Sequence, residues 1–355
     1  MKVLITGACG FVGSRLAEAL AKLIPGLEIV GFDNLLRAGS ETNRAALTSR
    51  GMQYVHGDVR MRSDMDAVPS CDWIIDAAAN PSVLAGVDGR SSSRQLSEHN
   101  LAGTLNMLEY CRERKAGLVL LSTSRVYSVR DLAALPMRSA GNTFCLDDKQ
   151  SLCEGVSAAG ITESFPARQP ISLYGATKLS SEIMAIEYGL TFGFPVWINR
   201  CGVLAGAGQF GTAEQGIFSY WLHAHAARLP LRYIGFGGRG FQVRDAFHPE
   251  DLAALLALQL RRDPPENPIY NVSGGGRNAM SLAQLTAWCD EQFGRHQPQP
   301  DVRPRPFDIP WLVMDHARTA SDFGWSPERS ITDILTEITA HVRANPGWLN
   351  RTGAV

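Results

Sequence analysis

A tyrosine and a lysine stand four positions apart in the stretch LYGATKLSSE, which spans residues 173–182. On a helix, Tyr174 and Lys178 share one face, because side chains four residues apart are neighbours. A tyrosine of ordinary pKa, about 10, is a weak base at neutral pH. A neighbouring ammonium favours the phenolate and lowers that pKa toward the range where a general base works best. The pair can therefore take a proton from a substrate hydroxyl, although a surface pair at a helix start has the same spacing.

A catalytic phenol also needs a hydrogen-bonding group beside it to orient the substrate. The stretch LLSTSRVY (120–127) ends a predicted strand and offers three hydroxyls, those of Ser122, Thr123 and Ser124. Each hydroxyl can both donate and accept a hydrogen bond. The residues alone leave open which of the three does so.

The stretch TGACGFVGS (6–14) places Gly7, Gly10 and Gly13 between a predicted strand at 2–7 and a predicted helix at 14–24. Glycines let the backbone turn tightly and approach a pyrophosphate closely. The start of the helix then offers unpaired N–H groups and the positive end of its dipole to the anion. This arrangement predicts a dinucleotide site.

An aspartate follows at the distance that such a site requires. Asp33 ends the second predicted strand (27–34), 20 residues after Gly13, where a carboxylate can hold the adenosine ribose hydroxyls. Because its charge repels a 2′-phosphate, we expect NAD rather than NADP, although Arg37 nearby can weaken that preference. Asp33 can also serve as a loop cap. Asp58, in HGDVR, ends the third predicted strand, where it can meet the adenine or form a turn.

Strands and helices alternate through the first part of the chain. Strands are predicted at 2–7, 27–34, 52–60, 72–79, 117–124 and 195–203, and helices at 14–24, 100–115 and 177–193. This alternation predicts an α/β fold with a Rossmann-type doubly wound parallel sheet. After residue 205 the sequence has glycine-rich loops, helices at 249–262 and 281–293, and a proline-rich stretch at 298–310. We therefore expect an NAD-binding domain at 1–200, with the catalytic residues, and a smaller C-terminal α/β region at 201–355.

Charge and composition exclude several classes of function. A net charge of −1 without long runs of either sign disfavours nucleic-acid or membrane-surface binding. The seven cysteines are scattered without C-x-x-C spacing, so no metal site is expected, and their odd number favours a reducing compartment. Neither a signal peptide nor a membrane span is recognisable. We expect a cytoplasmic protein.

From the glycine loop to DFGWSPERSITD, the chain resembles the extended short-chain dehydrogenases/reductases of the NAD-dependent nucleotide-sugar epimerase and dehydratase group. In that family the catalytic hydroxyl stands four residues before the Tyr of a VYG-like turn, here Tyr127, which selects Thr123. The implied catalytic triad is Thr123, Tyr174 and Lys178, with NAD as cofactor and a nucleotide-diphosphate sugar as substrate. The implied cofactor-binding residues are Gly7, Gly10, Phe11, Val12, Gly13, Asp33, Asn34, Asp58, Val59, Ala77, Ala78, Asn100, Tyr174 and Lys178.

Two further segments resemble the family's substrate-binding side, which lies mainly in 201–355. GFQVRDAFHPEDLA (240–253) implies that Arg244 grips the diphosphate, and RPFDIPWLVMD (305–315) implies Arg305 on the diphosphate and Asp308 on the nucleotide ribose. A guanidinium pairs with phosphate through a planar fork, although either arginine can instead be a solvated surface side chain. The implied substrate-binding residues are Asn80, Ser124, Arg125, Gln209, Gln215, Arg244, Arg305 and Asp308.

The residues after Thr123 distinguish branches of this family. The dehydratases carry an Asp-Glu pair there, and this chain has Ser124 and Arg125. An arginine cannot act as the base for water loss. The long gap between Tyr127 and Tyr174, FCLDDK (144–149) and AGQFGTAEQGIFSYW (207–221) resemble the branch that inverts C2 of a CDP-linked deoxysugar. The insertion 128–165 and QFGTAEQG are then expected to line the sugar pocket.

Other readings stay open, because the chain departs from the family pattern at Val203, Ala205 and Gly208 and has VYS in place of VYG. The alternatives are a nucleotide-sugar 4-epimerase such as a UDP-sugar 4-epimerase, a nucleotide-sugar dehydrogenase or reductase, and a non-catalytic NAD-binding regulator. Helices at 97–115 and 177–193 form a four-helix dimer interface in the family, so a homodimer is expected. Their apolar residues can instead pack on the chain's own sheet; these are Met107, Leu108, Cys111, Met184 and Tyr188.

Overall fold

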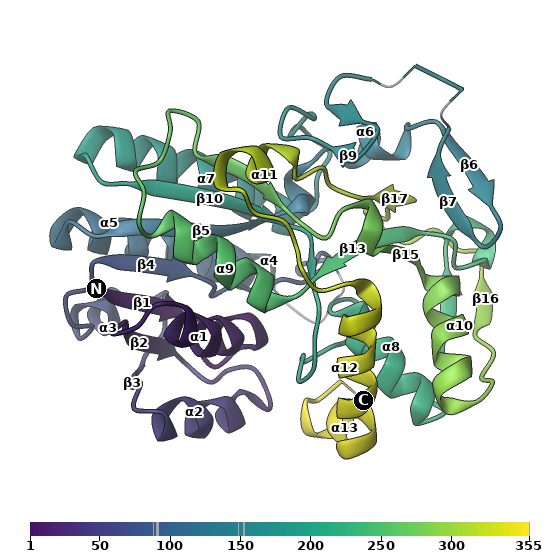
Figure 1. The fold of residues 1–355 in the computed structure, drawn as a ribbon, viewed down its shortest axis with the longest axis horizontal. Coiled ribbons are helices and arrows are strands. Elements are labelled where there is room, and N and C mark those ends of the chain that lie inside the picture. Colours follow the sequence, from purple (N-terminus) through teal and green to yellow (C-terminus); the bar gives the residue numbers. More distant parts are fainter. Residues whose placement is uncertain (88, 90–91, 148, 152, 355) are drawn as a thin grey trace.

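The computed structural model describes residues 1–354 except 88, 90, 91, 148 and 152. Its centre is a sheet of seven parallel strands in the order β14-β10-β5-β4-β1-β2-β3 (Figure 1). The strands are β1 (Lys2–Thr6), β2 (Glu28–Asp33), β3 (Gln53–His56), β4 (Trp73–Asp76), β5 (Gly117–Thr123), β10 (Val196–Cys201) and β14 (Ile269–Val272). The strand order reverses between β1 and β4, and ligands bind at the carboxyl ends of the strands at such a switch point. The predicted doubly wound sheet is confirmed.

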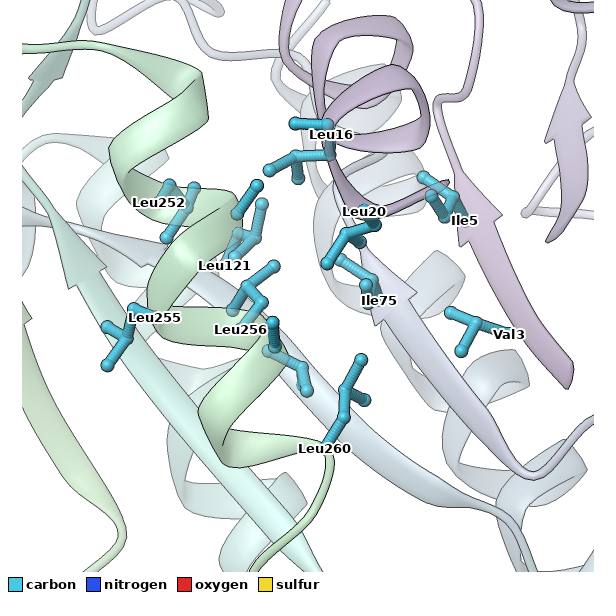
Figure 2. Packing of buried hydrophobic residues seen from close by; sticks show 14 of the residues in the cluster. Val3, Ile5, Leu16, Leu20, Ile75, Leu121, Leu252, Leu255, Leu256 and Leu260 are labelled. Carbon is cyan, nitrogen blue, oxygen red and sulfur yellow. The ribbon is translucent and has the colours of Figure 1, made fainter. Parts of the chain in front are cut away.

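The central strands are apolar because both faces of the sheet are covered. Every residue of β5 and of β10 is buried. On one face, α1 (Phe11–Leu23) and α9 (Pro249–Gln259) lie side by side, and Leu16 and Leu20 pack with Leu252 and Leu256 over the strands (Figure 2). The other face carries α3 (Arg62–Asp66), α5 (Gly103–Arg114) and α7 (Leu173–Phe192), and α2 (Ser40–Ser49) lies near β3.

Helix α7 begins four residues before the predicted start at 177. The Ser172 hydroxyl accepts a hydrogen bond from the Gly175 N–H at 3.0 Å and so caps the first turn. Tyr174 therefore lies in the first turn of the helix, with Lys178 one turn later. Both side chains are buried against the sheet.

The helix predicted at 100–115 begins only at Gly103, as α5, and two short segments precede it, α4 (Ser93–Ser97) and a π-helical turn η1 (Glu98–Ala102). Single π-helical turns are frequent at functional sites. The helix α5 that follows buries Met107, Leu108 and Cys111 against the chain's own sheet. On the neighbouring α7, Ile183, Leu190 and Phe192 stay exposed.

The C-terminal part has a small sheet of β11 (Val203–Leu204), β13 (Val243–Phe247), β15 (Ala279–Ser281) and β17 (Trp311–Leu312). Its helices are α8 (Ile217–Ala226), α10 (Leu282–Phe293), α11 (Ala317–Phe323), α12 (Ile331–Ala344) and α13 (Trp348–Arg351), and β12 (Arg232–Ile234) pairs with β16 (Gln299–Asp301). The chain crosses between the two parts more than once, since β14 and α9 lie beyond residue 200 but complete the first sheet and its cover. No helix in the described part of the chain is long and apolar enough to span a bilayer.

The insertion 128–165 forms α6 (Val129–Ala133) and two hairpins, β6 (Met137–Ala140) with β7 (Thr143–Leu146) and β8 (Val156–Ser157) with β9 (Gly160–Ile161). These hairpins pack on the C-terminal part. Phe144 N–H donates to Phe241 O at 3.0 Å, and Ile161 N–H donates to Val313 O at 2.8 Å. Asp148, within FCLDDK, lies outside the described residues.

Candidate active site

A cavity of about 660 Å³ lies between the carboxyl ends of the central strands and the C-terminal part. All the residues expected from the sequence to bind cofactor or substrate line it, except Asp58 and Asn100. The catalytic candidates Thr123, Tyr174 and Lys178 lie on the same wall as the glycine loop, and Arg244, Arg305 and Asp308 lie on the C-terminal side. One continuous cavity therefore holds all three groups of residues.

The glycine loop has the geometry that a pyrophosphate site needs. Gly7 has a φ of +62°, which favours glycine, and a Cβ at Gly13 would lie 2.2 Å from Gly7 O. Only a glycine at 13 lets α1 start so close to the end of β1. The first turn of α1 lines the cavity, so its N–H groups can hold an anion there. These residues fit the phosphates of NAD.

Asp33 lies at the carboxyl end of β2, beside the glycine loop. Its carboxylate accepts hydrogen bonds from Cys9 N–H at 2.9 Å and Leu35 N–H at 2.7 Å, which fix its orientation. Burial raises the pKa of Asp33, and these two backbone bonds oppose the rise. Arg37 donates a hydrogen bond to Phe210 O. Because it is held there, Arg37 does not offset the charge of Asp33.

Two expected cofactor ligands do not reach the cavity. The Asp58 carboxylate binds the Arg60 guanidinium at 2.6 Å and the Asn34 amide at 3.0 Å, so its oxygens are used locally. Asn100 is buried in the π-helical turn, where it accepts from Asn80 N–H at 2.8 Å and donates to Thr177 Oγ1 at 3.2 Å. Asn100 thus ties the loop after β4 to α7.

Tyr174 is the central group of the expected triad. Burial raises its pKa to about 12, and Thr123, which hydrogen-bonds the phenol, and the charge of Arg125 oppose the rise. The sequence predicted that the Lys178 ammonium would lower the pKa of Tyr174. That stays a prediction, and the charge of Arg125 acts on the phenol in the same direction. The side chain of Arg125 enters the cavity from the turn η2 (Ser124–Val126), directly after β5.

Lys178 is buried one helical turn after Tyr174. Burial lowers the pKa of Lys178, and Asp76, Cys201 and Glu182 oppose this effect. Asp76 is itself fixed by Thr6 Oγ1 at 2.7 Å and Thr104 Oγ1 at 3.2 Å. Within the described residues, no hydrogen bond or ion pair is recorded for the Lys178 ammonium, so its donors are available to a ligand in the cavity.

Glu182 continues the helical face of Tyr174 and Lys178 by one more turn and forms a buried ion pair with Arg200. Arg200 Nη2 lies 2.7 Å from Glu182 Oε2, and the two side chains are only 6% and 2% exposed. Ser122, next to Thr123, donates a hydrogen bond to the other carboxylate oxygen. The pair therefore fixes β5, α7 and β10 relative to one another at the carboxyl end of the sheet.

The C-terminal side of the cavity collects positive charge. Arg244 Nη2 lies 3.4 Å from Asp308 Oδ1, and Arg125 Nη1 donates to Phe307 O at 3.3 Å. Arg305 lines the same region. Asp308, which was expected to hold a ribose, also accepts from Ile309 N–H at 2.9 Å. Three guanidiniums and one carboxylate leave an excess of positive charge, which suits a diphosphate.

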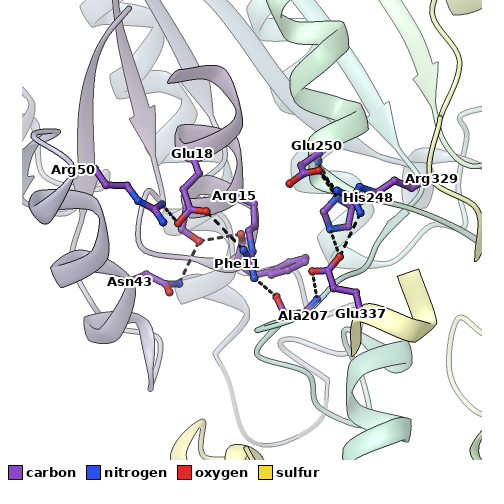
Figure 3. Close-up of polar contacts among 11 residues, drawn as sticks. Phe11, Arg15, Glu18, Asn43, Arg50, Ala207, His248, Glu250, Arg329 and Glu337 are labelled. Atoms are coloured by element: carbon purple, nitrogen blue, oxygen red, sulfur yellow. Dashed lines mark hydrogen bonds and ion pairs between the residues drawn. The ribbon is translucent and has the colours of Figure 1, made fainter. Parts of the chain in front are cut away.

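Part of the loop 205–216 lines the cavity, and Ala207 in this loop is held from both sides (Figure 3). Arg15 of α1 donates to Ala207 O at 2.8 Å, and Ala207 N–H donates to Glu337 of α12 at 3.2 Å. His248 Nε2 lies 3.1 Å from the same Glu337 carboxylate. Burial raises the pKa of Glu337, but His248, Ala207 N–H and Arg15 bring it down to about 2. The Glu337 carboxylate is thus held ionised where it accepts the hydrogen bond from Ala207 N–H.

The expected role of the insertion is wrong. Residues 209–210 and 213–218 line the cavity, as predicted for QFGTAEQG, but no described residue of 128–165 does. The insertion instead supports the far side of the cavity wall, where Ser281 Oγ donates to Asn142 O at 2.8 Å.

The structure also shows where the three residues that depart from the family pattern lie. Val203 lines the cavity, and Ala205 is fully buried. Gly208 has a φ of +77°, and a Cβ there would lie 3.5 Å from the Arg15 guanidinium, so Arg15 occupies the space beside it.

Some lining residues were not found from the sequence. Gln242 is the first residue of the QVRD motif, which could have identified it, whereas His99 carries no signal of its own.

With the site in place, comparison with known proteins decides the family. Residues 3–273 match the NAD dependent epimerase/dehydratase family, which is most of the chain. The chain belongs to this family. Its NAD dependence agrees with the cofactor expected from the glycine loop, and the resemblance stated from the sequence is confirmed.

Relatives within the family differ in the reaction that they catalyse. The CDP-paratose 2-epimerase of Salmonella typhi is 28% identical over 343 residues, 94% of this chain and 96% of that enzyme. The dTDP-glucose 4,6-dehydratase of Streptomyces antibioticus is 25% identical over 356 residues, 98% of this chain and 94% of the other. The NAD complex of the UDP-glucose 4-epimerase from Thermus thermophilus has a TM-score of 0.75 and 26% identity, covering 97% of this chain and 99% of that one.

Replacing Asp33 tests the cofactor end of the site. We expect Asp33→Ala to weaken NAD binding roughly 10- to 150-fold, the range for a charged hydrogen bond, and to bring NAD and NADP affinities closer together. Titration of the cofactor-free protein with both dinucleotides measures this. Arg37→Ala is the control, since Arg37 binds Phe210 O. Equal affinity of the wild-type protein for NAD and NADP would contradict the assignment.

Replacing Glu182 tests the buried ion pair. We expect Glu182→Gln to lower the free energy of unfolding by about 3–5 kcal/mol, because Arg200 keeps a buried charge without its partner. Denaturant titration measures the loss. Glu98→Gln is the matched control, since Arg94 and Glu98 form an exposed pair, at 87% and 39% exposure, and such pairs contribute about 1 kcal/mol or less. Equal losses of unfolding free energy in the two variants would show that the buried pair contributes no more to stability than the exposed pair.

Proposed function

We propose that this protein is an NAD-dependent nucleotide-sugar epimerase that inverts one hydroxyl-bearing carbon through a keto intermediate. The observation that carries the proposal is the charge distribution of the cavity, with Tyr174, Thr123 and Lys178 at one end and three arginines around Asp308 at the other. Ser124 and Arg125 stand where the dehydratase branch has an acidic pair. This supports a reaction that moves one proton and one hydride without loss of water.

Each catalytic residue has a defined task in this reaction. The Tyr174 phenolate takes the proton from the sugar hydroxyl and returns it at the end of the cycle. Thr123 orients the hydroxyl beside the phenol, and Lys178 directs its free donors to the cofactor ribose. When bound, NAD supplies reversible hydride acceptance. Arg244 and Arg305 hold the diphosphate, so the flat keto sugar can turn while the nucleotide stays in place.

Within this class, we infer that the substrate is a CDP-linked deoxysugar and that C2 is inverted. The CDP-paratose 2-epimerase relative supports this, since it is similar over 94% of the chain. The segment QFGTAEQG, on which the resemblance partly rests, contributes Gln209 and Gln215 to the cavity wall. The second candidate is a 4-epimerase, which is favoured by the likeness to the Thermus thermophilus structure.

All seven cysteines are free thiols, which supports the cytoplasm as the compartment.

The fold also supports a homodimer through α5 and α7. Ile183, Leu190 and Phe192 leave 56%, 74% and 49% of their surfaces exposed on α7. Tyr188, on the same helix, donates to Glu109 of α5 at 2.8 Å, so the two helices present one joint surface. Met107, Leu108 and Cys111 take no part, because they are buried in the protomer core.

Introducing a charge on this surface tests the dimer. We expect Leu190→Asp to convert the wild-type dimer to a monomer in sedimentation velocity, because a carboxylate on an apolar interface must be desolvated without a partner. Val302→Asp, at a side chain 71% exposed away from these helices, is the control and should remain dimeric. A monomeric wild-type protein would refute the interface.

Isotopic labelling tests which carbon reacts. With a CDP-deoxysugar deuterated at C2, we expect a primary kinetic isotope effect and full retention of deuterium, because the same hydride returns to the same carbon. Deuterium at C4 should have no effect on the rate, and the two measurements use the same enzyme and mass spectrometry of the product. An isotope effect at C4, with inversion at C4 in the product NMR spectrum, would instead support the 4-epimerase. Stoichiometric NADH release would indicate a dehydrogenase.

A further inference from the structure

The loop 205–216 joins the cofactor end of the cavity to the C-terminal helices. Phe210, near the middle of the loop, is buried in a cluster with Phe11 of α1 and Trp348 of α13. The rings of Phe210 and Trp348 stack with their centroids 5.7 Å apart and their planes at 15°. Trp348 Nε1 also donates to Gln209 O at 2.9 Å. Helix α13 therefore holds this part of the loop against the first turn of α1.

The loop also meets the adenosine end of the expected cofactor site. Arg37, four residues after Asp33, donates to Phe210 O. A Cβ at Gly39 would lie 3.2 Å from the Phe210 ring, so the two segments are in close contact. Phe210 and Arg37 line the cavity, as do Phe11 and Asp33. Phe210 thus bridges the helix that fits the pyrophosphate and the segment that fits the adenosine ribose.

The start of the loop is a peptide held between two helices. Arg15 of α1 donates to Ala207 O at 2.8 Å, and Ala207 N–H donates to Glu337 of α12 at 3.2 Å (Figure 3). The preceding residue fits tightly, because a Cβ at Gly206 would lie 2.9 Å from His248 Nε2. The Glu337 carboxylate is therefore the acceptor that ties the start of the loop to the C-terminal helices.

Glu337 is itself held in one orientation. His248 Nδ1 accepts a hydrogen bond from Glu250 N–H at 3.2 Å, so the proton of the neutral ring is on Nε2. His248 Nε2 lies 3.1 Å from Glu337 Oε2, and Arg329 Nη1 lies 3.9 Å from the same oxygen. Glu337 Oε1 is left to accept from Ala207 N–H. No residue of α12 lines the cavity, so Glu337 can act on a ligand there only through the loop.

We propose that Glu337 is a positioning residue for cofactor retention. Through Ala207 it holds the loop 205–216 closed over the cofactor site, and the loop must open before NAD can enter or leave. This inference rests on the NAD site of the family and goes beyond the proposed reaction on the sugar.

The proposal makes a specific statement about rates. The contacts that close the loop join protein groups to one another, so they have no differential affinity for the cofactor. Weakening them raises the rate constants of association and release together and leaves the dissociation constant nearly unchanged. Loss of a group that binds NAD directly, as expected for Asp33, changes the dissociation constant instead.

Four variants test this statement. Glu337→Ala removes the acceptor, Glu337→Gln keeps an oxygen for Ala207 N–H without the charge, and Trp348→Phe removes the indole donor at the other hold on the loop. Asp333→Ala is the matched control, because Asp333 bonds Ser330 in the cap of the same helix and its loss weakens α12 itself. Stopped-flow fluorescence measures association and release of NADH with the cofactor-free protein. Hydrogen–deuterium exchange mass spectrometry measures the opening of the loop.

For Glu337→Ala we expect both rate constants for NADH to rise roughly 10- to 150-fold, the range for a hydrogen bond to a charged group, while the dissociation constant stays within about threefold of the wild type. The amides of 209–216 should exchange faster by a similar factor. Glu337→Gln should lie between Glu337→Ala and the wild type. Trp348→Phe should raise both rate constants roughly 2- to 12-fold, the range for a neutral hydrogen bond. Asp333→Ala should match the wild type in both.

The proposal is overturned if Glu337→Ala leaves both rate constants unchanged. It is also overturned if only release accelerates and the NADH affinity falls in proportion, because the loop is then a ligand contact and not a closure. Equal acceleration by Asp333→Ala overturns it as well, since Glu337 then acts only through the stability of α12.

Two further outcomes stay distinguishable. If Glu337→Ala does not fold, Glu337→Gln and Trp348→Phe carry the test, and unchanged rate constants in both overturn the proposal. If the proposed epimerase function fails, no nucleotide sugar is converted, while the NADH rate constants of these variants still report on the loop.

Discussion

The site depends on one buried ion pair. Glu182 and Arg200 lie at the carboxyl end of the sheet, and removing two charges from water is unfavourable unless their contacts are nearly complete. The contacts of this pair are nearly complete, because Arg200 Nε also donates to Glu182 Oε1 at 3.1 Å and Ser122 donates to the same oxygen. These contacts also fit the pairing register of β5 and β10, in which Ser122 stands opposite Arg200 and Thr123 opposite Cys201. The position of Thr123 relative to Tyr174 is therefore set by a pair that touches neither.

Much of this arrangement can be predicted from the sequence, because it follows from local periodicity. Alternating strands and helices predict the sheet, and the spacing of Tyr174 and Lys178 predicts their shared helical face; Glu182, four residues further on, repeats that spacing and could have been found in the same way. For Asp58 the sequence left two roles open, and Arg60, two residues later, is a visible local partner. Sequence patterns were sufficient to predict contacts between residues that are close together in the chain.

The remaining features arise from contacts between distant segments, and the sequence carries no signal for those. The guanidinium of Arg125 donates to Phe307 O, while its backbone runs along the start of α7. The insertion 128–165 packs behind the wall of the cavity, since its hairpins pair with the segments around Phe241 and Val313. Gly208 departs from the family pattern where Arg15, 193 residues earlier, fills the space beside it. Each outcome depends on which surfaces meet, and not on the residue types alone.

The sign of the charge at position 125 limits what the site can do. A carboxylate there would raise the pKa of Tyr174 and could also exchange a proton with the sugar, which water loss requires. An arginine has the opposite effect on the phenol and has no acceptor for a proton. Tyr174 is then the proton acceptor at this end of the cavity, with Thr123 and Lys178 as hydrogen-bond donors. Such a site can oxidise and reduce a single carbon, and a change of configuration must come from turning the flat keto sugar between the two steps. In the proposed reaction Arg244 and Arg305 hold the diphosphate away from the phenol, which allows that turn without release of the substrate.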